Sequence, residues 1–346
     1  MRPSLAFPVC SLILAALSTG CSAPPAPAPP PAAAPAPAAA PAAAGRIVRT
    51  TPGLDALVPA DARIEKVAGG FQFTEGPLWR PDGTLWFSDV VGNVVRSVTP
   101  DGAVKVLIPN AGGVSSAPPG SFVGSNGITA DRDGTVYLVQ HTGRQIVRVG
   151  PDLKMTTFLD KFEGKRFNSP NDLVFRSDGA LYFTDPPFGL VKQDDDPAKE
   201  LSFNGVFRYA HGRLTAVVRD LKRPNGIAFS PDEKTLYVSD SDTAHKVVMR
   251  YDVGPDGNVS GGRVLIDMTK DTATGVPDGM KVDERGNVYA TGPGGVWVLA
   301  PDGTHLGTIQ PPETPANCAW GDDGKTLYMT AETSVYRIKL SVGGKK

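Results

Sequence analysis

The sequence has few of the residues that cross-link small proteins or carry nucleophilic chemistry. Its 346 residues include 3 cysteines and 4 histidines and contain no G-x-S-x-G motif, so a serine hydrolase built on a nucleophile elbow has little support. Charge is balanced at 35 basic and 36 acidic residues, without a run of six or more like charges. This balance argues against nucleic acid or another polyanion as the partner.

The first 45 residues form no part of the predicted fold. A basic start and an apolar stretch over 5–17, too short to span a bilayer comfortably, indicate a signal peptide. The next residues, Leu-Ser-Thr-Gly-Cys, resemble a lipobox, although Leu17 lies one place further from Cys21 than usual. We therefore predict a signal peptide over 1–21 with lipidated Cys21, an Ala/Pro-rich linker over 22–45, and a periplasmic or membrane-anchored lipoprotein. The alternative is a plain secretory signal with a coincidental cysteine.

A hairpin unit recurs six times in the rest of the chain. Its clearest copy spans 167–190, where two short apolar runs flank an Asp-Gly turn, a pattern typical of a β-hairpin. The second run of each copy carries an aromatic residue: Trp86, Tyr137, Tyr182, Tyr237, Tyr289 and Tyr328. A polar residue opens each first run: Glu75, Asn126, Asn171, Asn225, Asp278 and Asn317. The polar residue precedes the aromatic one by 11 positions in every copy except the fourth, where the spacing is 12.

Repeats of this size, filled with short strands, predict an all-β fold, a six-bladed β-propeller over 46–346. Helix should be nearly absent. The last repeat has room for only three strands, so we expect a strand near 62–67 to complete the sixth blade and cover its open edge. Cys318 is the one cysteine outside the predicted signal and lipid site, so stability must come from the core and ring closure.

The opening residues of the six inner strands should meet near the propeller axis. They offer two carboxylates and four amides, hard oxygen ligands that suit Ca²⁺, Mg²⁺ or Mn²⁺ better than zinc, which usually takes His or Cys. We predict a divalent cation, with Ca²⁺ as the first expectation and Zn²⁺, Mn²⁺ or Mg²⁺ as alternatives. The predicted ligands are Glu75, Asn171, Asn225 and Asp278. The alternative interpretation is that these residues are structural polar caps.

Four motifs resemble the SMP-30/gluconolactonase/LRE-like family, which includes regucalcin and bacterial gluconolactonases. They are FTEGP (73–77), FNSPND (167–172), RPNGIAFSPD (223–232) and VPDGMKVDERGNVY (276–289). The resemblance implies a six-bladed propeller whose cation is bound by Glu75, Asn225 and Asp278, with Asn171 facing the substrate or the metal. Ser169 stands where regucalcin-like members have a substrate-binding Arg, which leaves Arg166 as a possible substitute. Gln140 precedes His141 where gluconolactonase-like members often have Glu-His.

The resemblance also implies hydrolysis of a sugar-type lactone by a carboxylate-activated water. Asp278 is the first choice for the general base, and Asp240 and Asp185, at the ends of their strands, are second choices. The predicted substrate contacts are Asn171, Asn126, His141 and Arg166. The insertion 186–201, with Phe188, is expected to form a lid or a pocket wall.

Two other functions stay open at this point. One is a metal-dependent phosphotriesterase, and the other is a non-catalytic propeller that binds a ligand or a partner at the cell envelope, because fold alone does not decide function. The expected partner is a small-molecule lactone. We expect no binding to nucleic acid, and contact with the membrane only through a lipid anchor. The expected protein is a monomer.

Overall fold

The computed structural model describes residues 45–114 and 122–345. The predicted signal peptide, Cys21 and all of the predicted linker except Gly45 lie outside these described residues. The described chain is almost entirely β-strand, with two short 3-10 turns, η1 (Pro52–Ala56) and η2 (Gln193–Asp195). No helix in this part of the chain is long and apolar enough to cross a membrane.

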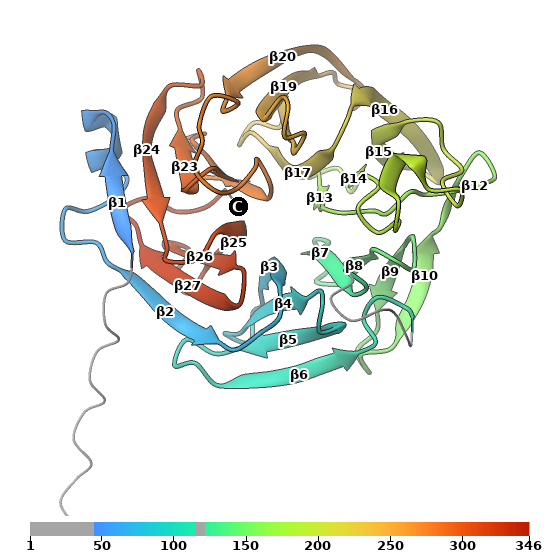
Figure 1. The fold of residues 1–346 in the computed structure, drawn as a ribbon, viewed down its shortest axis with the longest axis horizontal. Helices are drawn as coiled ribbons and strands as arrows, with labels where there is room; N and C mark the ends of the chain where they lie inside the picture. Colours follow the sequence, from blue (N-terminus) through green and yellow to red (C-terminus); the bar gives the residue numbers. More distant parts are fainter. Residues whose placement is uncertain (1–44, 115–121, 346) are drawn as a thin grey trace, which may run out of the picture. The chain divides into compact units, whose positions relative to one another are not determined.

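The strands form six antiparallel sheets arranged as blades around a centre (Figure 1). The first blade comprises β3 (Thr74–Trp79), β4 (Leu85–Asp89), β5 (Val94–Val98) and β6 (Val104–Pro109). The second comprises β7 (Ser125–Ala130), β8 (Val136–Gln140), β9 (Gln145–Val149) and β10 (Met155–Leu159). The third comprises β13 (Leu173–Phe175), β14 (Leu181–Asp185), β15 (Asn204–Ala210) and β16 (Arg213–Leu221). A small hairpin of β11 (Lys161–Phe162) and β12 (Lys165–Arg166) lies between the second and third blades in sequence.

The fourth blade follows the same order as the first three. It comprises β17 (Pro224–Phe229), β18 (Thr235–Asp240), β19 (Val247–Val253) and β20 (Val259–Asp267). The fifth blade has β21 (Met280–Val282), β22 (Val288–Gly292), β23 (Gly295–Leu299) and β24 (His305–Gln310), and the sixth has β25 (Pro315–Gly321), β26 (Thr326–Ala331) and β27 (Ser334–Lys339). The six-bladed propeller predicted from the repeat is therefore confirmed.

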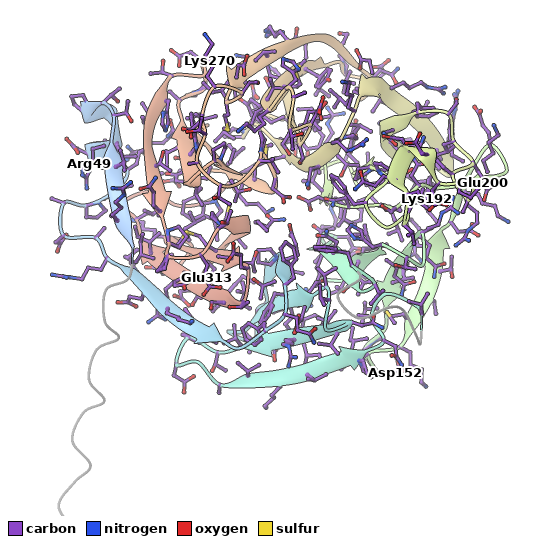
Figure 2. All side chains as sticks on the ribbon, in the orientation of Figure 1. Arg49, Asp152, Lys192, Glu200, Lys270 and Glu313 are labelled. Carbon is purple, nitrogen blue, oxygen red and sulfur yellow. The ribbon has the colours of Figure 1, made fainter. Side chains whose placement is uncertain are left out.

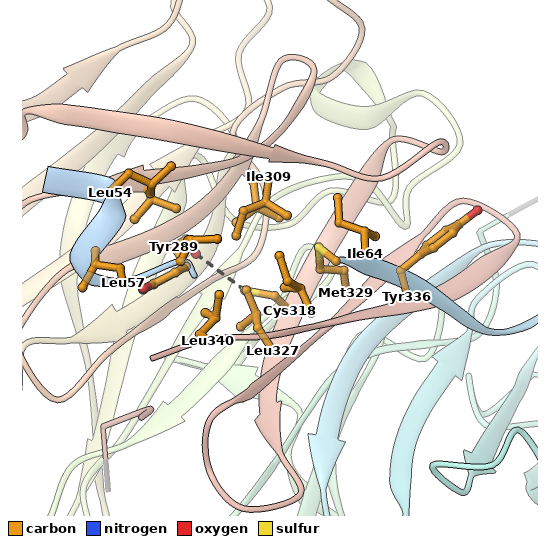
Figure 3. Close-up of a cluster of buried hydrophobic side chains, with 14 of the residues drawn as sticks. Leu54, Leu57, Ile64, Tyr289, Ile309, Cys318, Leu327, Met329, Tyr336 and Leu340 are labelled. Atoms are coloured by element: carbon orange, nitrogen blue, oxygen red, sulfur yellow. Dashed lines mark hydrogen bonds between the residues drawn. The ribbon is translucent and has the colours of Figure 1, made fainter. Parts of the chain in front are cut away.

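The sixth blade is completed by a strand from the N-terminal side, as predicted. β2 (Ile64–Gly69) pairs with β27, so that Ile64 lies opposite Ile338. The core behind this junction joins Ile64 and Tyr336 to residues of the fifth and sixth blades, including the fully buried Cys318 (Figure 3). Burial of these apolar side chains contributes about 25 cal/mol per Å², so the junction that closes the ring is also a large core.

One strand was not anticipated from the sequence. β1 (Arg46–Arg49) pairs with β24 and extends the fifth blade to five strands. It is only four residues long, has two adjacent apolar residues between two arginines, and follows an Ala/Pro-rich segment, so the hairpin repeat gave no reason to expect it. The folded part thus begins well before the first repeat.

Candidate functional site

Irregularities of the inner strands position the six polar residues of the repeats. In β3, β7, β17 and β25 the register against the second strand shifts at or beside the polar residue. Asn171 and Asp278 instead lie two residues before β13 and β21 begin. A bulge re-aims a side chain that a regular ladder would place on a sheet face. All six residues consequently lie at or beside an interruption of regular pairing, at the same end of their blades.

Glycine follows the polar residue in four of the six repeats and allows the inner strands to approach closely. At Gly226, an added Cβ would lie 2.2 Å from the carbonyl oxygen of Asp278 in the next blade. At Gly76, it would lie 2.0 Å from the carbonyl oxygen of Asn126. No other residue type fits at such distances. These glycines therefore bring the polar residues of adjacent blades together.

Hydroxyl side chains on the second strands fix the main chain of these polar residues. Ser88, Thr184 and Ser239 each donate a 2.7 Å hydrogen bond to the carbonyl oxygen of the polar residue in the next blade. The acceptors are Asn126, Asn225 and Asp278, respectively. We did not predict this role. The signal was a Ser or Thr just before the last residue of the second strand, as in TLWFSD and ALYFTD.

Glu75 and Asp278 form the acidic part of the site. Burial raises the pKa of Glu75 to about 7, and the nearby charge of Asp172 adds to the effect. Burial and the charges of Glu75 and Asp172 raise the pKa of Asp278 well above its usual value. Among the ion pairs of the described residues, none includes Glu75 or Asp278. The charge of Lys281 lowers the pKa of Glu75 but forms no ion pair with it. Two close carboxylates with little exposure and no ion-pair partner are unfavourable unless a further positive charge binds them.

The amides differ in which atom is left for a ligand. Asn317 uses both ends of its side chain, because Nδ2 donates to Glu75 Oε2 (3.0 Å) and Oδ1 accepts the N–H of Cys318 (2.9 Å). Asn225 uses its nitrogen, which donates to Ser241 Oγ at 3.0 Å. Its side-chain oxygen is therefore the atom left for a ligand, whereas Asn317 holds Glu75 in place.

His141 lies between two of the amides. Its Nε2 is 3.1 Å from Asn126 Nδ2 and 3.3 Å from Asn171 Nδ2. The ring is only 2% exposed, and burial lowers its pKa to about 4. The imidazole is therefore neutral at physiological pH. The amide nitrogens face Nε2 and identify it as the hydrogen-bond acceptor, while the buried Nδ1 has no partner.

The sequence matches a known protein family over most of its length. The model of the SMP-30/Gluconolactonase/LRE-like region matches residues 73–333. The chain belongs to this family. It is 40% identical over 311 residues to a gluconolactonase of Zymomonas mobilis, with 87% of each chain covered. It is 27% identical to Xenopus laevis regucalcin over 273 residues, covering 77% of this chain and 85% of the relative.

Solved structures agree with the family assignment. A gluconolactonase of Xanthomonas campestris superposes with a TM-score of 0.75 at 32% identity, covering 89% of this chain and 99% of the other. A further gluconolactonase-like structure gives the same TM-score at 33% identity, with 87% and 100% covered. The bulged inner strands and their polar residues are thus features of a member of the SMP-30/gluconolactonase family.

Asp172 is a site residue that the sequence analysis missed. Its side chain is buried, burial raises its pKa, and Oδ2 has no hydrogen-bond partner. Its charge acts on both Glu75 and Asp278. The signal was present in the family motif FNSPND, because an aspartate there follows Asn171 at a position where four of the other five repeats have glycine.

Asp240 and Asp185, considered from the sequence as second choices for the general base, bind main-chain N–H groups in the structure. Asp240 accepts the N–H groups of Lys222 (3.0 Å) and Arg223 (2.8 Å). Asp185 likewise accepts the N–H groups of Asn168 and Ser169, both at 2.8 Å. These aspartates tie the loop that precedes an inner strand to the end of the second strand. Their bonds favour a structural role over that of general base.

Arg166, considered as a substrate contact, is not brought to the axial residues. It is exposed on β12, and its guanidinium donates to the carbonyl oxygen of Gly143 at 2.9 Å. The run of aspartates in the insertion makes surface contacts: Asp194 accepts a hydrogen bond from Asn204 Nδ2 at 2.9 Å and forms an ion pair with Arg223. Neither feature adds a ligand to the axial cluster.

The donor set fits a hard divalent cation. Asp278 Oδ1 is buried without a partner, and Glu75 and Asp278 raise each other's cost of ionisation. No group of three His, Cys, Asp or Glu side chains arranged for a metal occurs among the described residues, so a site here depends on amide oxygens as well. Carboxylate and amide oxygens are the ligands that Ca²⁺ and Mg²⁺ prefer. Glu75, Asn171, Asn225 and Asp278 are the residues that would hold the ion.

Proposed function

We propose that this chain is a metal-dependent lactonase that opens a sugar-type lactone to the hydroxy acid. The observation that carries the proposal is the buried Asp278 oxygen, which has no partner and lies next to a second buried carboxylate. The family supports it, because a 40% identical relative over 87% of the chain is a gluconolactonase. Regucalcin-like relatives support dependence on a divalent cation.

Asp278, Glu75 and the groups that hold Glu75 have defined tasks in this proposal. A cation held by Glu75, Asn171, Asn225 and Asp278 would supply polarisation of the lactone carbonyl and would stabilise the negative charge that develops on its oxygen. Asp278 would accept the proton of the attacking water through the carboxylate oxygen that does not hold the cation, because its Oδ1 is free of any hydrogen bond within the described chain. Asn317 and the N–H of Gly76 hold the Glu75 carboxylate in its orientation. The water oxygen bonds to the carbonyl carbon, the bond between that carbon and the ring oxygen breaks, and the proton that Asp278 accepted passes to the ring oxygen, which becomes a hydroxyl.

His141 orients the substrate in this proposal. It is neutral, and Asn126 and Asn171 fix its ring from one side. A neutral imidazole orients the two amides that face the substrate without carrying charge into the site. Substrate contacts are therefore assigned to His141, Asn126 and Asn171.

The test is a pH-stat assay of acid release from a panel of aldonolactones. The protein is assayed as purified, after EDTA treatment, and after addition of Ca²⁺, Mn²⁺ or Zn²⁺. The proposal expects turnover that EDTA abolishes and at least one of the ions restores. Turnover unaffected by EDTA would refute metal dependence. Hydrolysis of a phosphotriester such as paraoxon without lactone opening would favour the phosphotriesterase alternative, and inactivity on both would favour a binding propeller.

We also propose export with lipid attachment at Cys21, which rests on the signal-like segment over 1–21. The test is expression in a bacterial host with labelled palmitate. Incorporation of label that the Cys21→Ser variant lacks would support it. Unlabelled, released protein from both forms would leave only a secretory signal.

A further inference from the structure

The insertion 186–201 lies directly against the main chain of site residues. Gly189 N donates to Ser169 Oγ at 2.7 Å, and that hydroxyl donates to the carbonyl oxygen of Pro186 at 2.8 Å. An added Cβ at Gly189 would lie 2.6 Å from the carbonyl oxygen of His141. The first turn of the insertion is therefore packed on His141 and Ser169, without space for a side chain between them.

A single buried guanidinium, that of Arg144, hydrogen-bonds both to the insertion and to the segment before Asn168. Arg144 follows His141 by three residues and is 4% exposed. Its Nε donates to the carbonyl oxygen of Phe167 at 2.6 Å, and its Nη1 donates to that of Ala198 at 2.8 Å. Its own N–H closes the turn on Gln140 O at 2.8 Å. Arg144 thus joins three segments: the turn that carries His141, the segment before Asn168, and the far end of the insertion.

Burial of a guanidinium is costly unless its donors are used. Nε and Nη1 of Arg144 are used, whereas Nη2 has no hydrogen-bond partner. The planar fork of the guanidinium holds its donors in a fixed geometry, which suits two carbonyl groups on different segments. Glu200 lies 3.7 Å from Arg144 Nη2 and is 40% exposed, so it gives partial charge compensation from the solvent side. Lys192 lies nearer the centre of the ring than Glu200, which lies towards its rim (Figure 2). Arg144 contacts the insertion at Ala198, two residues before Glu200.

We propose that Arg144 is a positioning residue that holds the insertion and the His141 turn together as a fixed wall on the substrate side of the site. The inference rests on the proposed lactonase function. It makes the insertion a rigid specificity element instead of a lid that opens in each catalytic cycle. Lactones that are bound through His141 then depend on Arg144 for affinity, although Arg144 does not touch them.

The metal side of the site is held by other contacts. Asn171 N donates to Thr184 O at 2.9 Å, and its carbonyl oxygen accepts Gly127 N at 2.8 Å. Glu75 and Asp278 lie in the first and fifth blades. Loss of the Arg144 clamp should consequently change substrate affinity and leave ion affinity nearly unchanged.

The test compares Arg144→Met and Arg144→Lys with Asp194→Ala, which cuts the exposed attachment of the same insertion to Arg223 and Asn204. For Arg144→Met we expect KM to rise about tenfold with kcat within about threefold, because the wall binds substrate and transition state alike. Arg144→Lys, which keeps the charge but loses the fork, should give an intermediate KM. Asp194→Ala should leave KM within about twofold of the wild-type value.

Two further readouts separate positioning from loss of fold. Hydrogen exchange should show faster exchange at Gly189 N–H in Arg144→Met and no change in Asp194→Ala, and calorimetric titration with Ca²⁺ should give Kd values within about threefold of wild type for all variants. Equal KM values in Arg144→Met and wild type, or equal exchange at Gly189, would overturn the inference. A wild-type protein that opens no lactone would instead overturn the proposed function, and the exchange measurement would still decide whether Arg144 clamps the insertion.

Discussion

Two sets of carboxylates lie at the same end of the blades and have opposite environments. Asp89, Asp185 and Asp240 end their second strands, and each accepts at least two main-chain N–H groups from the loop that precedes an inner strand. Glu75, Asp172 and Asp278 belong to the inner edge of the blades. Asp172 and Asp278 each keep an oxygen that has no partner. Five of these six residues are at most 5% exposed, and Asp278 is partly exposed.

The difference teaches that burial alone does not mark a functional carboxylate. A strand-end aspartate contributes to the fold because its oxygens are satisfied by donors that the loop would otherwise leave unpaired. An axial carboxylate costs stability in the metal-free protein and is retained because a ligand compensates it. Substitutions should therefore act with opposite signs in the two sets.

The largest effect is expected for Asp278→Asn. Replacing the proposed base should lower kcat/KM for lactone opening by about 10³-fold or more, because both proton transfer and ion binding are lost. A pH-stat assay at saturating Ca²⁺ measures this, and far-ultraviolet circular dichroism confirms that the sheets persist. Activity within tenfold of wild type would remove Asp278 from the chemistry.

The next largest effect is expected for Glu75→Gln, which should stabilise the metal-free protein. In the EDTA-treated protein at pH 8, Glu75→Gln should raise the free energy of unfolding by about 1–2 kcal/mol, since it removes one of three neighbouring buried charges. Urea unfolding followed by tryptophan fluorescence gives the value. A destabilised Glu75→Gln protein would mean that Glu75 is structural, as the polar-cap alternative holds.

Asp240→Asn is the matched control from the other set. It replaces an acceptor of the Lys222 and Arg223 N–H groups with an amide that can satisfy fewer of them, so stability should fall by about 1–3 kcal/mol. Lactone opening at 20 °C should stay within about tenfold of wild type. A loss as large as that of Asp278→Asn would restore Asp240 as a candidate base.

The smallest effect concerns Glu313, a satisfied carboxylate away from the axis (Figure 2). Although burial opposes it, hydrogen bonds from Ser334, Thr333 and Tyr336 lower the pKa of Glu313 from 4.5 to about 2. A lowered pKa means that its stabilisation is present above about pH 4.5 and is lost as the pH falls towards 2. Glu313→Gln should therefore cost about 1 kcal/mol at pH 7 and progressively less in acid, measured by urea unfolding from pH 7 to 3. A constant difference over that range would contradict the assignment.

Much of the architecture could be predicted from the sequence because it depends on a repeated local pattern. The 11-residue spacing reflects a hairpin of fixed length, and in the structure Tyr137 and Tyr182 pair with Thr129 and Val174, each three residues after the polar residue. Closure by β2 followed from a strand missing in the last repeat. β1 could not be predicted because an edge strand of four residues has no repeat partner.

The site could be predicted only as far as the repeat extends. Equivalent positions in the repeat identified the axial residues. The sequence cannot distinguish a strand-end aspartate that caps a loop from one that accepts a proton. For Asp240 the distinction comes from the main-chain N–H groups that donate to it. Asp172 was overlooked because it is an exception to the repeat. The task of Arg144 depends on contacts with Phe167 and Ala198, which no local pattern encodes.

The most direct test of the central claim is calorimetric titration of the EDTA-treated protein with Ca²⁺, alongside Asp278→Asn and Asp240→Asn. The claim is that unsatisfied axial oxygens bind one divalent ion. We expect one ion per chain for wild type and Asp240→Asn, with affinity lowered at least about 100-fold in Asp278→Asn. Absence of binding to wild type by Ca²⁺, Mn²⁺ and Zn²⁺, or equal affinity in Asp278→Asn, would contradict it.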